Sequence, residues 1–356
     1  MSISKNPPKQ NTGASIDAWH AVPNEFEDQD AWKARLQIDG SQHIRLVELN
    51  HCRYQHADIP KITEFLNDFG MHIVKETAQM IWWKGYGTHP YEYVVVKGPE
   101  PKYLGNTFLV ESYQDLERAS KLPGASQIKW LDDSPGGGNL VTIIDPDDFP
   151  VNLIYGQVQD KEVEANIPPE LILNYETKKQ RLGAYQRFTQ GPAAVYRIGH
   201  FGICIENFAR SFDFYIRTFN LVPSDIVYAD GDSGRIDCAA FFHIDRGEEY
   251  TDHHTFFLGQ SPRRRIHHTS FEVHDFDTQL LGHRWLEKKG YKIMWGVGRH
   301  LLGSQIFDYW WDTSGFMIEH YADGDVVNNT TKVGKASISD DAMSVWGPDR
   351  PIGWIK

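Results

Sequence analysis

Three residues in the second half of the chain have types and positions suited to holding one divalent metal ion. His200, His268 and Glu319 each lie in a strand-like run, respectively "GHFGICIEN", "RIHHTSFEV" and "FMIEHYAD". Two neutral imidazoles and one carboxylate on one face of a divalent ion leave coordination positions open, and non-haem Fe(II) oxygenases use this arrangement. The residue types therefore predict a metal site with room for small ligands.

The alternation of polar and apolar residues along these runs indicates which side chains can converge. Successive residues on a strand point to opposite faces of the sheet. If His200 and His268 face a pocket, Phe201 and Phe271 face the apolar side, as a half-buried strand requires. The same alternation separates the neighbours His267 and His268, so we expect only His268 to reach the metal.

The elements that must position these residues repeat four times along the chain. Each unit reads as a strand, a helix and further strands, and the units begin near Ile44, Tyr103, Tyr196 and Ile266. Repetition of one supersecondary unit predicts an α+β fold made of four βαβββ modules.

The first half offers a counterpart for each of the three residues. We aligned "LNHCRYQ" with "IGHFGIC", "LGNTFLVES" with "IHHTSFEVH", and "DPDDFPVNLIYG" with "DTSGFMIEHYAD". One histidine and two asparagines are a poorer donor set than two histidines and a glutamate, so we interpret the first half as a degenerate unit without metal. The counterparts are His51 for His200, Asn106 for His268 and Asn152 for Glu319.

Changes in composition along the chain predict five segments. A polar bridge with prolines and mixed charge separates the two halves, and such segments are typical of domain boundaries. The predicted segments are an N-terminal arm (1–43), a first domain without metal (44–157), a linker (158–194), a second domain with the metal residues (195–325) and a C-terminal tail (326–356).

The composition argues against several classes of function. The chain of 356 residues has a net charge of -12 and a single short basic cluster, Arg263–Arg265, so we expect no nucleic acid as partner. No apolar run reaches the roughly 18–20 residues needed to span a bilayer, and the N-terminus lacks the apolar stretch of a signal peptide. Three cysteines without CxxC spacing suit a reducing compartment, so we expect a cytoplasmic protein without membrane contact.

The motifs of the second half, as a set, resemble those of the type I extradiol ring-cleaving dioxygenases. These enzymes belong to the vicinal oxygen chelate, or glyoxalase/bleomycin resistance, superfamily. The matching motifs are "GHFGICIEN", "RIHHTSFEV" and "GRHLLGSQIFDYWWDTSGFMIEHYAD", and the resemblance in architecture covers about residues 44–325. It implies four βαβββ modules paired into two open-barrel domains. It also implies Fe(II), with Mn(II) as the other candidate, held by His200, His268 and Glu319.

The resemblance implies three further active-site residues. The family's histidine 14 residues before the second ligand falls on His254, its "GRH" histidine on His300, and its tyrosine ten residues before the carboxylate on Tyr309. His254 would move a substrate proton, while Tyr309 and His300 would hydrogen-bond a substrate oxygen. The implied activity is cleavage of a catechol-type ring beside the diol with O2, in aromatic catabolism, by a homo-oligomer (dimer or tetramer).

The position of Tyr309 can also be argued from the residues themselves. If the last hairpin turns over the three residues 313–315, with Gly315 in the left-handed conformation, Tyr309 lies opposite Glu319 on the same face. A four-residue loop would place Tyr309 behind the sheet.

Several alternatives stay open on the sequence alone. His253 competes with His254, and His300 in the loop-like "GVGRH" could simply cap a turn. A glyoxalase-like lyase or isomerase, an oxo-acid dioxygenase, and a binding protein of the bleomycin-resistance type without metal are the competing functions. Aromatic side chains predict an apolar rim and therefore an apolar catechol. The predicted rim is Tyr228, Phe242, Trp295, Trp310 and residues 343–356.

Overall fold

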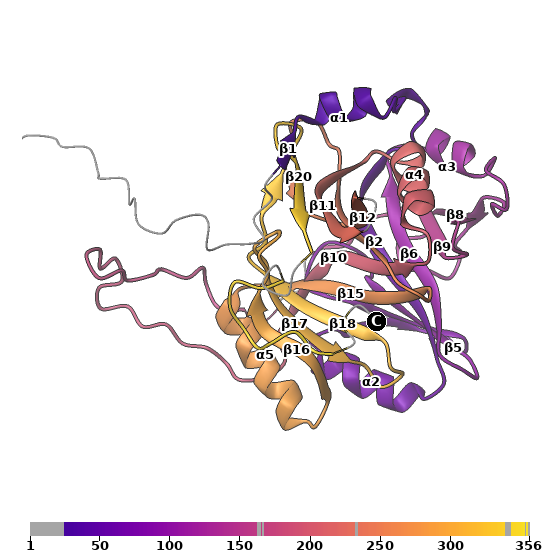
Figure 1. Ribbon diagram of the computed structural model, residues 1–356. Coiled ribbons are helices and arrows are strands. Elements are labelled where there is room, and N and C mark those ends of the chain that lie inside the picture. The colour runs from indigo at the N-terminus through magenta and orange to yellow at the C-terminus, as the bar shows by residue number, and fades with distance from the viewer. Residues whose placement is uncertain are drawn as a thin grey trace, which may run out of the picture.

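The computed structural model describes residues 25–161, 165, 167–231, 234–338, 343–352 and 354. Within these residues the chain forms two large curled β-sheets with helices packed against them (Figure 1). A third sheet of two strands is much smaller. The two large sheets correspond to the two halves of the sequence.

The first half contains two βαβββ units. Its elements are β2 (Leu46–His56), α2 (Ile59–Asp68), β3 (His72–Glu76), β4 (Met80–Lys84), β5 (Tyr93–Lys97), β6 (Lys102–Val110), α3 (Tyr113–Ala119), β7 (Lys129–Trp130), β8 (Asn139–Ile144) and β9 (Pro150–Tyr155). They form an eight-stranded sheet in the order β3-β4-β5-β2-β6-β9-β8-β7. β2 and β6 pair antiparallel in the centre and join the two units.

The second half repeats this arrangement. Its elements are β10 (Val195–Ile205), α4 (Phe208–Thr218), β11 (Leu221–Gly231), β12 (Gly234–Ile244), β13 (Thr251–Asp252), β14 (Phe256–Gln260), β15 (Arg265–Val273), α5 (Phe276–Lys288), β16 (Lys292–Arg299), β17 (Ile306–Trp311) and β18 (Met317–Ala322). The order β11-β12-β14-β10-β15-β18-β17-β16 matches that of the first half, with β10 and β15 in the centre. The prediction of four βαβββ modules is therefore confirmed.

The same local rule begins all four unit helices. A side chain just before each helix accepts a hydrogen bond from the backbone N–H three residues later, which satisfies one of the unpaired donors of the first turn. The apolar residues of each helix then face a sheet, as amphipathic spacing requires. The capping residues are Asp58, Ser112, Asn207 and Asp275.

The described parts of the predicted arm and tail are integral to the second half, whereas we expected an appendage and a tail. The additional elements are β1 (Glu25–Glu27), α1 (Gln29–Arg35), the 3-10 helix η2 (Gly40–Gln42), β19 (Val326–Val327) and β20 (Val333–Ser337). β20 pairs with β11 and β1 pairs with β20, so they cover a sheet edge that would otherwise offer unpaired backbone groups. Trp32 is 1% exposed and packs edge-on against Phe212. The remaining segment boundaries stay a prediction.

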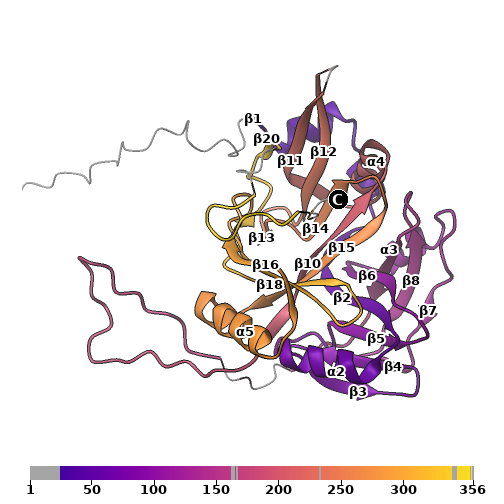
Figure 2. The ribbon, with the colours of Figure 1, turned by 60° about the horizontal axis from the view of Figure 1, so that its bottom comes forward.

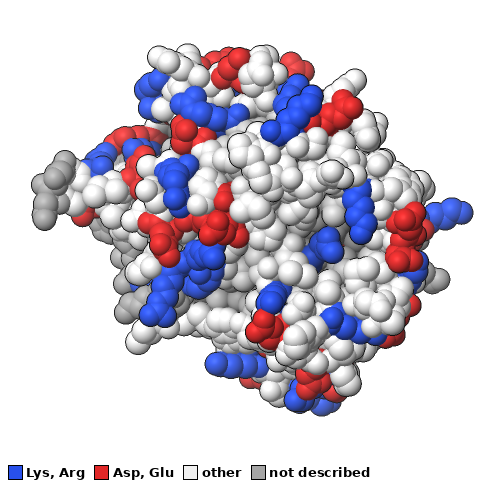
Figure 3. Space-filling model, turned by 90° about the vertical axis from the view of Figure 1, so that its right-hand side faces the viewer, with Lys and Arg blue, Asp and Glu red and all other residues white. Residues whose placement is uncertain are grey.

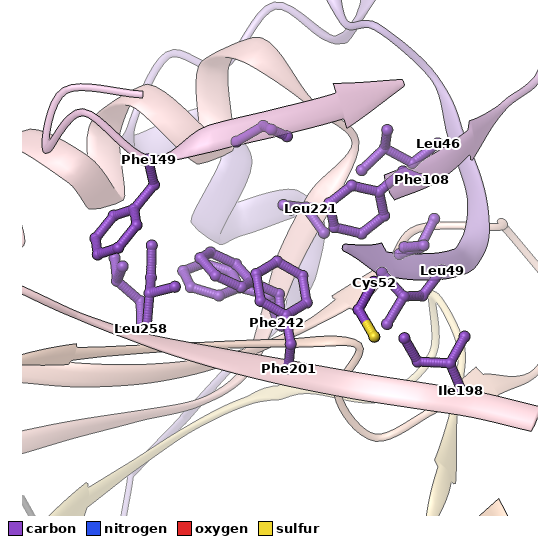
Figure 4. Close-up of a cluster of buried hydrophobic side chains, with 14 of the residues drawn as sticks. Leu46, Leu49, Cys52, Phe108, Phe149, Ile198, Phe201, Leu221, Phe242 and Leu258 are labelled. Carbon is purple, nitrogen blue, oxygen red and sulfur yellow. The ribbon is translucent and has the colours of Figure 1, made fainter. Parts of the chain in front are cut away.

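One hydrophobic core is shared by both halves. Leu46 and Phe108 of the first half lie against Ile198 and Phe201 of the second half in one cluster (Figure 4). The rings of Phe108 and Phe201 have centroids 5.7 Å apart. The apolar faces of the two central strand pairs thus bury each other, which leaves the opposite face of the second sheet for polar residues.

The molecular surface is mixed in charge on the face shown in Figure 3. Lys, Arg, Asp and Glu side chains are interspersed there around an uncharged area. Among the described residues, no helix combines the length and the apolar character that crossing a membrane demands.

Candidate metal centre and active site

The three predicted metal ligands lie on three neighbouring strands. β15 lies between β10 and β18. His200 on β10 pairs with Ser270 on β15, and Ser270 pairs with Glu319 on β18. His268 precedes Ser270 by two residues, so both side chains leave the same face of the sheet. The strand register brings the three side chains into the one potential metal-binding group found among the described residues.

The spacing of the ligand atoms suits a single ion. Nε2 of His200 lies 3.0 Å from Oε2 of Glu319, and Nε2 of His268 lies 3.6 Å from the same oxygen. Bonds of about 2.0–2.2 Å to one metal place neighbouring ligand atoms about 3 Å apart. All three side chains are buried, and Glu319 is 0% exposed.

Hydrogen bonding around the triad also fits a cation. Nε2 of His268 is buried and has no hydrogen-bond partner, although it faces Glu319. A buried polar atom without a partner lowers the stability of the fold by about 1–3 kcal/mol, and a bound metal ion would supply that partner. Ser270 Oγ donates to Glu319, and Gln305 Nε2 lies 3.4 Å from the other carboxylate oxygen. Outer partners of this kind orient metal ligands, and the donor set suits a divalent transition metal.

His267 lines the same cavity as His268, contrary to the alternation argument. Gly202 pairs with His268 and Ile203 pairs with Ile266, so His267 is the extra residue of a β-bulge. A bulge interrupts the two-residue period and lets neighbours share a face. Nδ1 of His267 lies 2.6 Å from Nδ1 of His268. His268 is still the residue that reaches the triad, but the reason we gave for rejecting His267 was wrong.

The partners of His267 determine which nitrogen of His268 is free. Nε2 of His267 lies 2.8 Å from the backbone carbonyl of Trp354, which can only accept, so Nε2 carries the hydrogen. Nδ1 of the neutral His267 ring then accepts from Nδ1–H of His268. The lone pair of His268 is therefore on Nε2, the atom that faces Glu319.

A second histidine pair is built in the same way. Nε2 of His253 lies 2.7 Å from Oδ2 of Asp225, and its Nδ1 lies 3.2 Å from Nδ1 of His254. A carboxylate accepts, so a neutral His253 carries its hydrogen on Nε2 and leaves the lone pair of His254 on Nε2. The ring of His254 lies 4.3 Å from that of His200, and His254 lines the cavity. The structure thus places His254, and not His253, beside the triad.

Tyr309 lies opposite Glu319, as a three-residue hairpin requires. The backbone N–H of Asp312 donates to the carbonyl of Phe316 over 2.8 Å, and Gly315 has a φ of 85°. Both features of the predicted turn are present. The hairpin therefore brings a phenol to the same face as the carboxylate ligand.

His300 directly follows β16, which contains the "GVGR" that we considered loop-like. Its ring stacks on Phe307 with centroids 4.1 Å apart. Nδ1 of His300 lies 2.7 Å from the carbonyl of Met343, and Nε2 lies 2.9 Å from the hydroxyl of Tyr309. Because the carbonyl only accepts, Nδ1 carries the hydrogen and Nε2 accepts from Tyr309.

Burial sets the protonation of these groups. It lowers the pKa of His254 and that of His268 well below 6.5, and neighbouring histidines add to the effect. It also lowers the pKa of His300. Burial raises the pKa of Tyr309 well above 10, with the Glu319 carboxylate adding to the shift. At neutral pH the imidazoles therefore keep their lone pairs and the phenol keeps its hydrogen.

The cavity beside the triad has a polar end and an apolar end. His254, His268, His300 and Tyr309 form the polar end. The apolar end lies between strands of the second sheet and the chain after β19. It includes Val227, Ala239, Leu302 and Ile338, whereas Phe241 and Met343 lie beside His254 and His300 of the polar end.

Most aromatic residues predicted at the rim lie elsewhere. Phe242 belongs to the shared core, whereas its neighbour Phe241 lines the cavity. Likewise Val227 lines it, whereas Tyr228 lies under the guanidinium of Arg235. In both cases the prediction chose the wrong face of a strand. Trp310 is also in the core and Trp295 packs behind Tyr309, so of the described rim prediction only Met343 and Trp354 line the cavity.

The counterpart of His268 in the first half is Gly105, not Asn106 as we predicted. His51 pairs with Thr107 in the first half. In the second half His200 pairs with Ser270, which follows His268 by two positions. Counting back two positions from Thr107 leads to Gly105. A one-residue shift changes the face on which a side chain lies, so Asn106 belongs to the other face.

In the first half, the polar side chains at the positions that correspond to the triad hydrogen-bond to neighbouring protein groups. The two ring nitrogens of His51 lie 2.6 Å from Asn50 Oδ1 and 3.0 Å from Thr107 Oγ1. Asn152, the counterpart of Glu319, accepts from Thr142 over 2.6 Å.

The sequence predicted no supporting role for Asp225, Gln305, His253 or His267. The repeated "HH" at 253–254 and 267–268 was a usable signal, because each pair contains one residue that faces the triad and one that holds it. Asp225 and Gln305 had no such signal, since both contacts join strands or loops far apart in sequence.

Comparison with known proteins agrees with this geometry. Residues 197–320 match the family model of the Glyoxalase/Bleomycin resistance protein/Dioxygenase superfamily. The matched stretch contains all six residues proposed for the site.

Similarity to individual proteins extends over both halves. Metapyrocatechase 2 of Cupriavidus necator is 26% identical over 320 residues, which cover 86% of this chain and 91% of that protein. The Mn(II)-bound glyoxalase of Novosphingobium aromaticivorans has a TM-score of 0.68 at 19% identity, covering 88% of this chain and 98% of that one.

A second similar structure is an anaerobic substrate complex. Homoprotocatechuate 2,3-dioxygenase of Brevibacterium fuscum, in complex with 3,4-dihydroxyphenylacetate, has a TM-score of 0.69 at 18% identity, covering 89% of this chain and 93% of that one. At these identities the two solved structures show a common fold, which confirms the vicinal oxygen chelate fold implied by the motifs.

Proposed function

We propose that the protein is a metal-dependent extradiol dioxygenase that opens a catechol-type ring beside its diol with O2, in aromatic catabolism. The proposed metal is Fe(II), with Mn(II) as the other candidate, and its ligands are His200, His268 and Glu319. The observation that carries the proposal is the meeting of this triad with His254 and Tyr309 at one cavity. The similarity to Metapyrocatechase 2 supports the same activity.

Each residue of the cavity has a distinct task in this proposal. A bound divalent metal would make coordinated hydroxyl groups more acidic and give the catechol and O2 a common attachment point. Nε2 of His254 bears a lone pair at neutral pH, so it can take a proton from a substrate hydroxyl and return it to an oxygen of the opening ring.

Tyr309 and His300 orient the substrate. Nε2 of His300 accepts the hydrogen of the Tyr309 hydroxyl, which leaves the phenol oxygen free to accept a hydrogen bond from a substrate hydroxyl. Fixing the substrate in this way removes much of the orientational cost of the reaction. The burial of the triad keeps bulk water away from the reacting groups.

The proposal is tested by alanine variants of the ligands. His200→Ala, His268→Ala and Glu319→Ala are each expected to lose bound metal and catechol-dependent oxygen uptake together. His51→Ala is the matched control, because His51 is the buried counterpart of His200 in the first half and should keep the metal. Full metal content in any of the three ligand variants would remove that residue from the proposed site.

A glyoxalase-type isomerase is the second candidate, and the similarity to the Mn(II)-bound glyoxalase favours it. Isomerisation consumes no oxygen. Oxygen uptake on adding catechols to the metal-loaded protein separates the two functions, since uptake in step with a coloured ring-opened product supports the dioxygenase and its absence supports the isomerase.

A further inference from the structure

The cavity contrasts strongly in polarity between its two ends. Its polar groups are gathered around the triad, where the diol would bind. The other described lining residues are apolar apart from Ser337, and they include Val227, Leu302 and Ile338, with Phe241 beside His254 (ring centroids 5.1 Å apart). None of the described residues that line the cavity is Lys, Arg, Asp or Glu.

Three basic side chains near the cavity have other partners, and the first, Arg265, donates to the carbonyl of Trp354 over 3.2 Å. Arg299 binds Asp323 over 2.8 Å, and Lys335, on the strand that leads into Ile338, binds Asp237 over 2.8 Å. A carboxylate on the substrate would therefore lose its hydration in the cavity without gaining a counter-charge from any described lining residue. Burying an unpaired charge is far more costly than burying an alkyl or aryl group.

We infer that the substrate is an uncharged catechol with an apolar substituent, which lies against the end formed by Val227, Leu302 and Ile338. This inference rests on the proposed dioxygenase function. It separates the chain from the similar structure that holds 3,4-dihydroxyphenylacetate, a catechol with a carboxylate.

A substrate panel tests this inference. The metal-loaded protein is given catechol, 4-alkylcatechols of increasing length, a phenyl-substituted catechol and 3,4-dihydroxyphenylacetate, and oxygen uptake gives kcat/KM for each. Each buried methylene is expected to raise kcat/KM about fourfold until the cavity is full. The carboxylated catechol is expected to fall about tenfold or more below an uncharged catechol of equal size.

The outcomes of the panel are distinguishable. Equal or better turnover of 3,4-dihydroxyphenylacetate would overturn the inference and leave the dioxygenase function intact. Uptake with none of the catechols would instead reject the proposed function, and the inference with it.

A gain-of-function variant gives a second test. Ile338 lines the cavity and is 43% exposed, so an arginine at this position can reach a substrate carboxylate while staying near solvent. Ile338→Arg is expected to shift the ratio of kcat/KM toward 3,4-dihydroxyphenylacetate by about tenfold or more. Ile352→Arg, at a residue that is 96% exposed, is the matched control. An unchanged ratio in Ile338→Arg would contradict the assignment of this end to the substituent.

A different part of the molecule carries a second, independent inference. Residues 167–190 stand away from the body as an extended loop, which we call the linker arm, in both Figure 1 and Figure 2. Apart from the bond of Ile167 N–H to the adjacent Ala165 (2.9 Å), its hydrogen bonds among the described residues stay within the arm, as between Arg181 and Asn174 (2.7 Å) or between Tyr175 and Lys178 (3.1 Å). The body of the same chain therefore does not hold it.

The linker arm displays apolar side chains to solvent. Leu182 is 80% exposed and Tyr185 is 78% exposed. Exposed apolar side chains gathered on one segment mark an interaction site more often than singly scattered ones do. The other members are Ile172, Leu173 and Tyr175, which are 50%, 51% and 56% exposed.

Charge and size point to a second copy of the chain as the partner. Four basic and two acidic residues give residues 167–190 a net charge of +2, whereas the whole chain has -12. An arm of this length also matches the roughly 20–30 residues per side of a standard interface. In a symmetric dimer each subunit gives an arm and receives one, so the contact is made twice.

We propose that the linker arm docks on a second copy of this chain and holds the homo-oligomer together. Sedimentation of the purified protein at micromolar concentration tests this proposal. The wild type is expected to be an oligomer, and the double variant Leu182→Asp, Tyr185→Asp is expected to associate about 100-fold more weakly. The double variant Trp130→Asp, Ile144→Asp, at residues that are 49% and 42% exposed on the outer strands β7 and β8, should keep the wild-type mass. A monomeric wild type, or an arm variant of unchanged mass, would overturn the proposal.

Discussion

Two histidine pairs explain how single residues of the site are oriented. In each pair the ring that faces the cavity gives its Nδ1 hydrogen to the ring of the preceding residue. The preceding ring is fixed in turn by an acceptor, Asp225 for His253 and the carbonyl of Trp354 for His267. The pairs thus fix the tautomer of a proposed base and of a proposed ligand with groups that are not themselves proposed metal ligands.

The role of His267 as a positioning residue leads to the first prediction. His267→Phe removes the acceptor for His268, so metal affinity is expected to fall about 10–100-fold. Competition with a chelator measures this affinity on the metal-free protein without any turnover. His267→Gln keeps an acceptor and a donor on one side chain and should restore most of it. Wild-type affinity in His267→Phe would show that the pair has no positioning role.

The Asp225–His253 contact leads to the second prediction. Asp225→Asn lets His253 take either tautomer, so the lone pair of His254 is on Nε2 only part of the time. We expect kcat to fall about tenfold or more at neutral pH, with metal content and the KM for catechol unchanged. Asp230→Asn, an exposed position on the same strand, is the control. A fall in metal content instead of kcat would place Asp225 in the metal site.

At the scale of elements, the periodicity of the sequence predicted the regular features of the fold. The four modules and the Tyr309 hairpin followed from the spacing of residues. A β-bulge at His267 and a one-residue register difference at Gly105 did not, because both depend on pairing with a strand far along the chain. The rim residues failed for the same reason, since the alternation along a strand does not say which face is the pocket.

The hairpin that presents Tyr309 leads to the third prediction. A Cβ at Gly315 would meet no atom within 4 Å, so the cost of a substitution there comes from its φ of 85° alone. Gly315→Ala is therefore expected to lower the free energy of unfolding by about 1–2 kcal/mol. Urea unfolding measures this change. Gly315→Asn should cost clearly less, because asparagine tolerates this conformation, and an equal cost for both would point to a steric cause.

At the scale of the whole molecule, the two halves depend on each other. They share one core, and residues 25–43 and 333–337 extend or cover the second sheet. The sequence did not predict this packing, because short strands such as β1 carry little periodicity and gain their stability from a sheet edge that the chain forms elsewhere. The proposed site therefore rests on contacts spread over most of the described chain.

Buried histidines outside the triad lead to the fourth prediction. Burial lowers the pKa of His243 to about 4. The unfolded chain takes up this proton near pH 6.5 and the folded one does not, so acid favours unfolding by about 2 kcal/mol between pH 7 and pH 5 through this group. Denaturant unfolding measures the change. Between pH 7 and pH 5 the free energy of unfolding of His243→Gln should fall by about 2 kcal/mol less than that of the wild type. Parallel curves for the two proteins would contradict the burial argument.

The carbonyl of Trp354 fixes His267, which fixes a proposed ligand 86 positions earlier in the chain. Residue 354 must therefore be synthesised before the imidazole of His268 is held in its orientation. A nascent chain that does not yet include residue 354 would bind the metal more weakly, so tight metal binding occurs late in synthesis. A protease that removes Trp354 is expected to lower the metal affinity about 10–100-fold without touching a residue that is proposed to coordinate the ion.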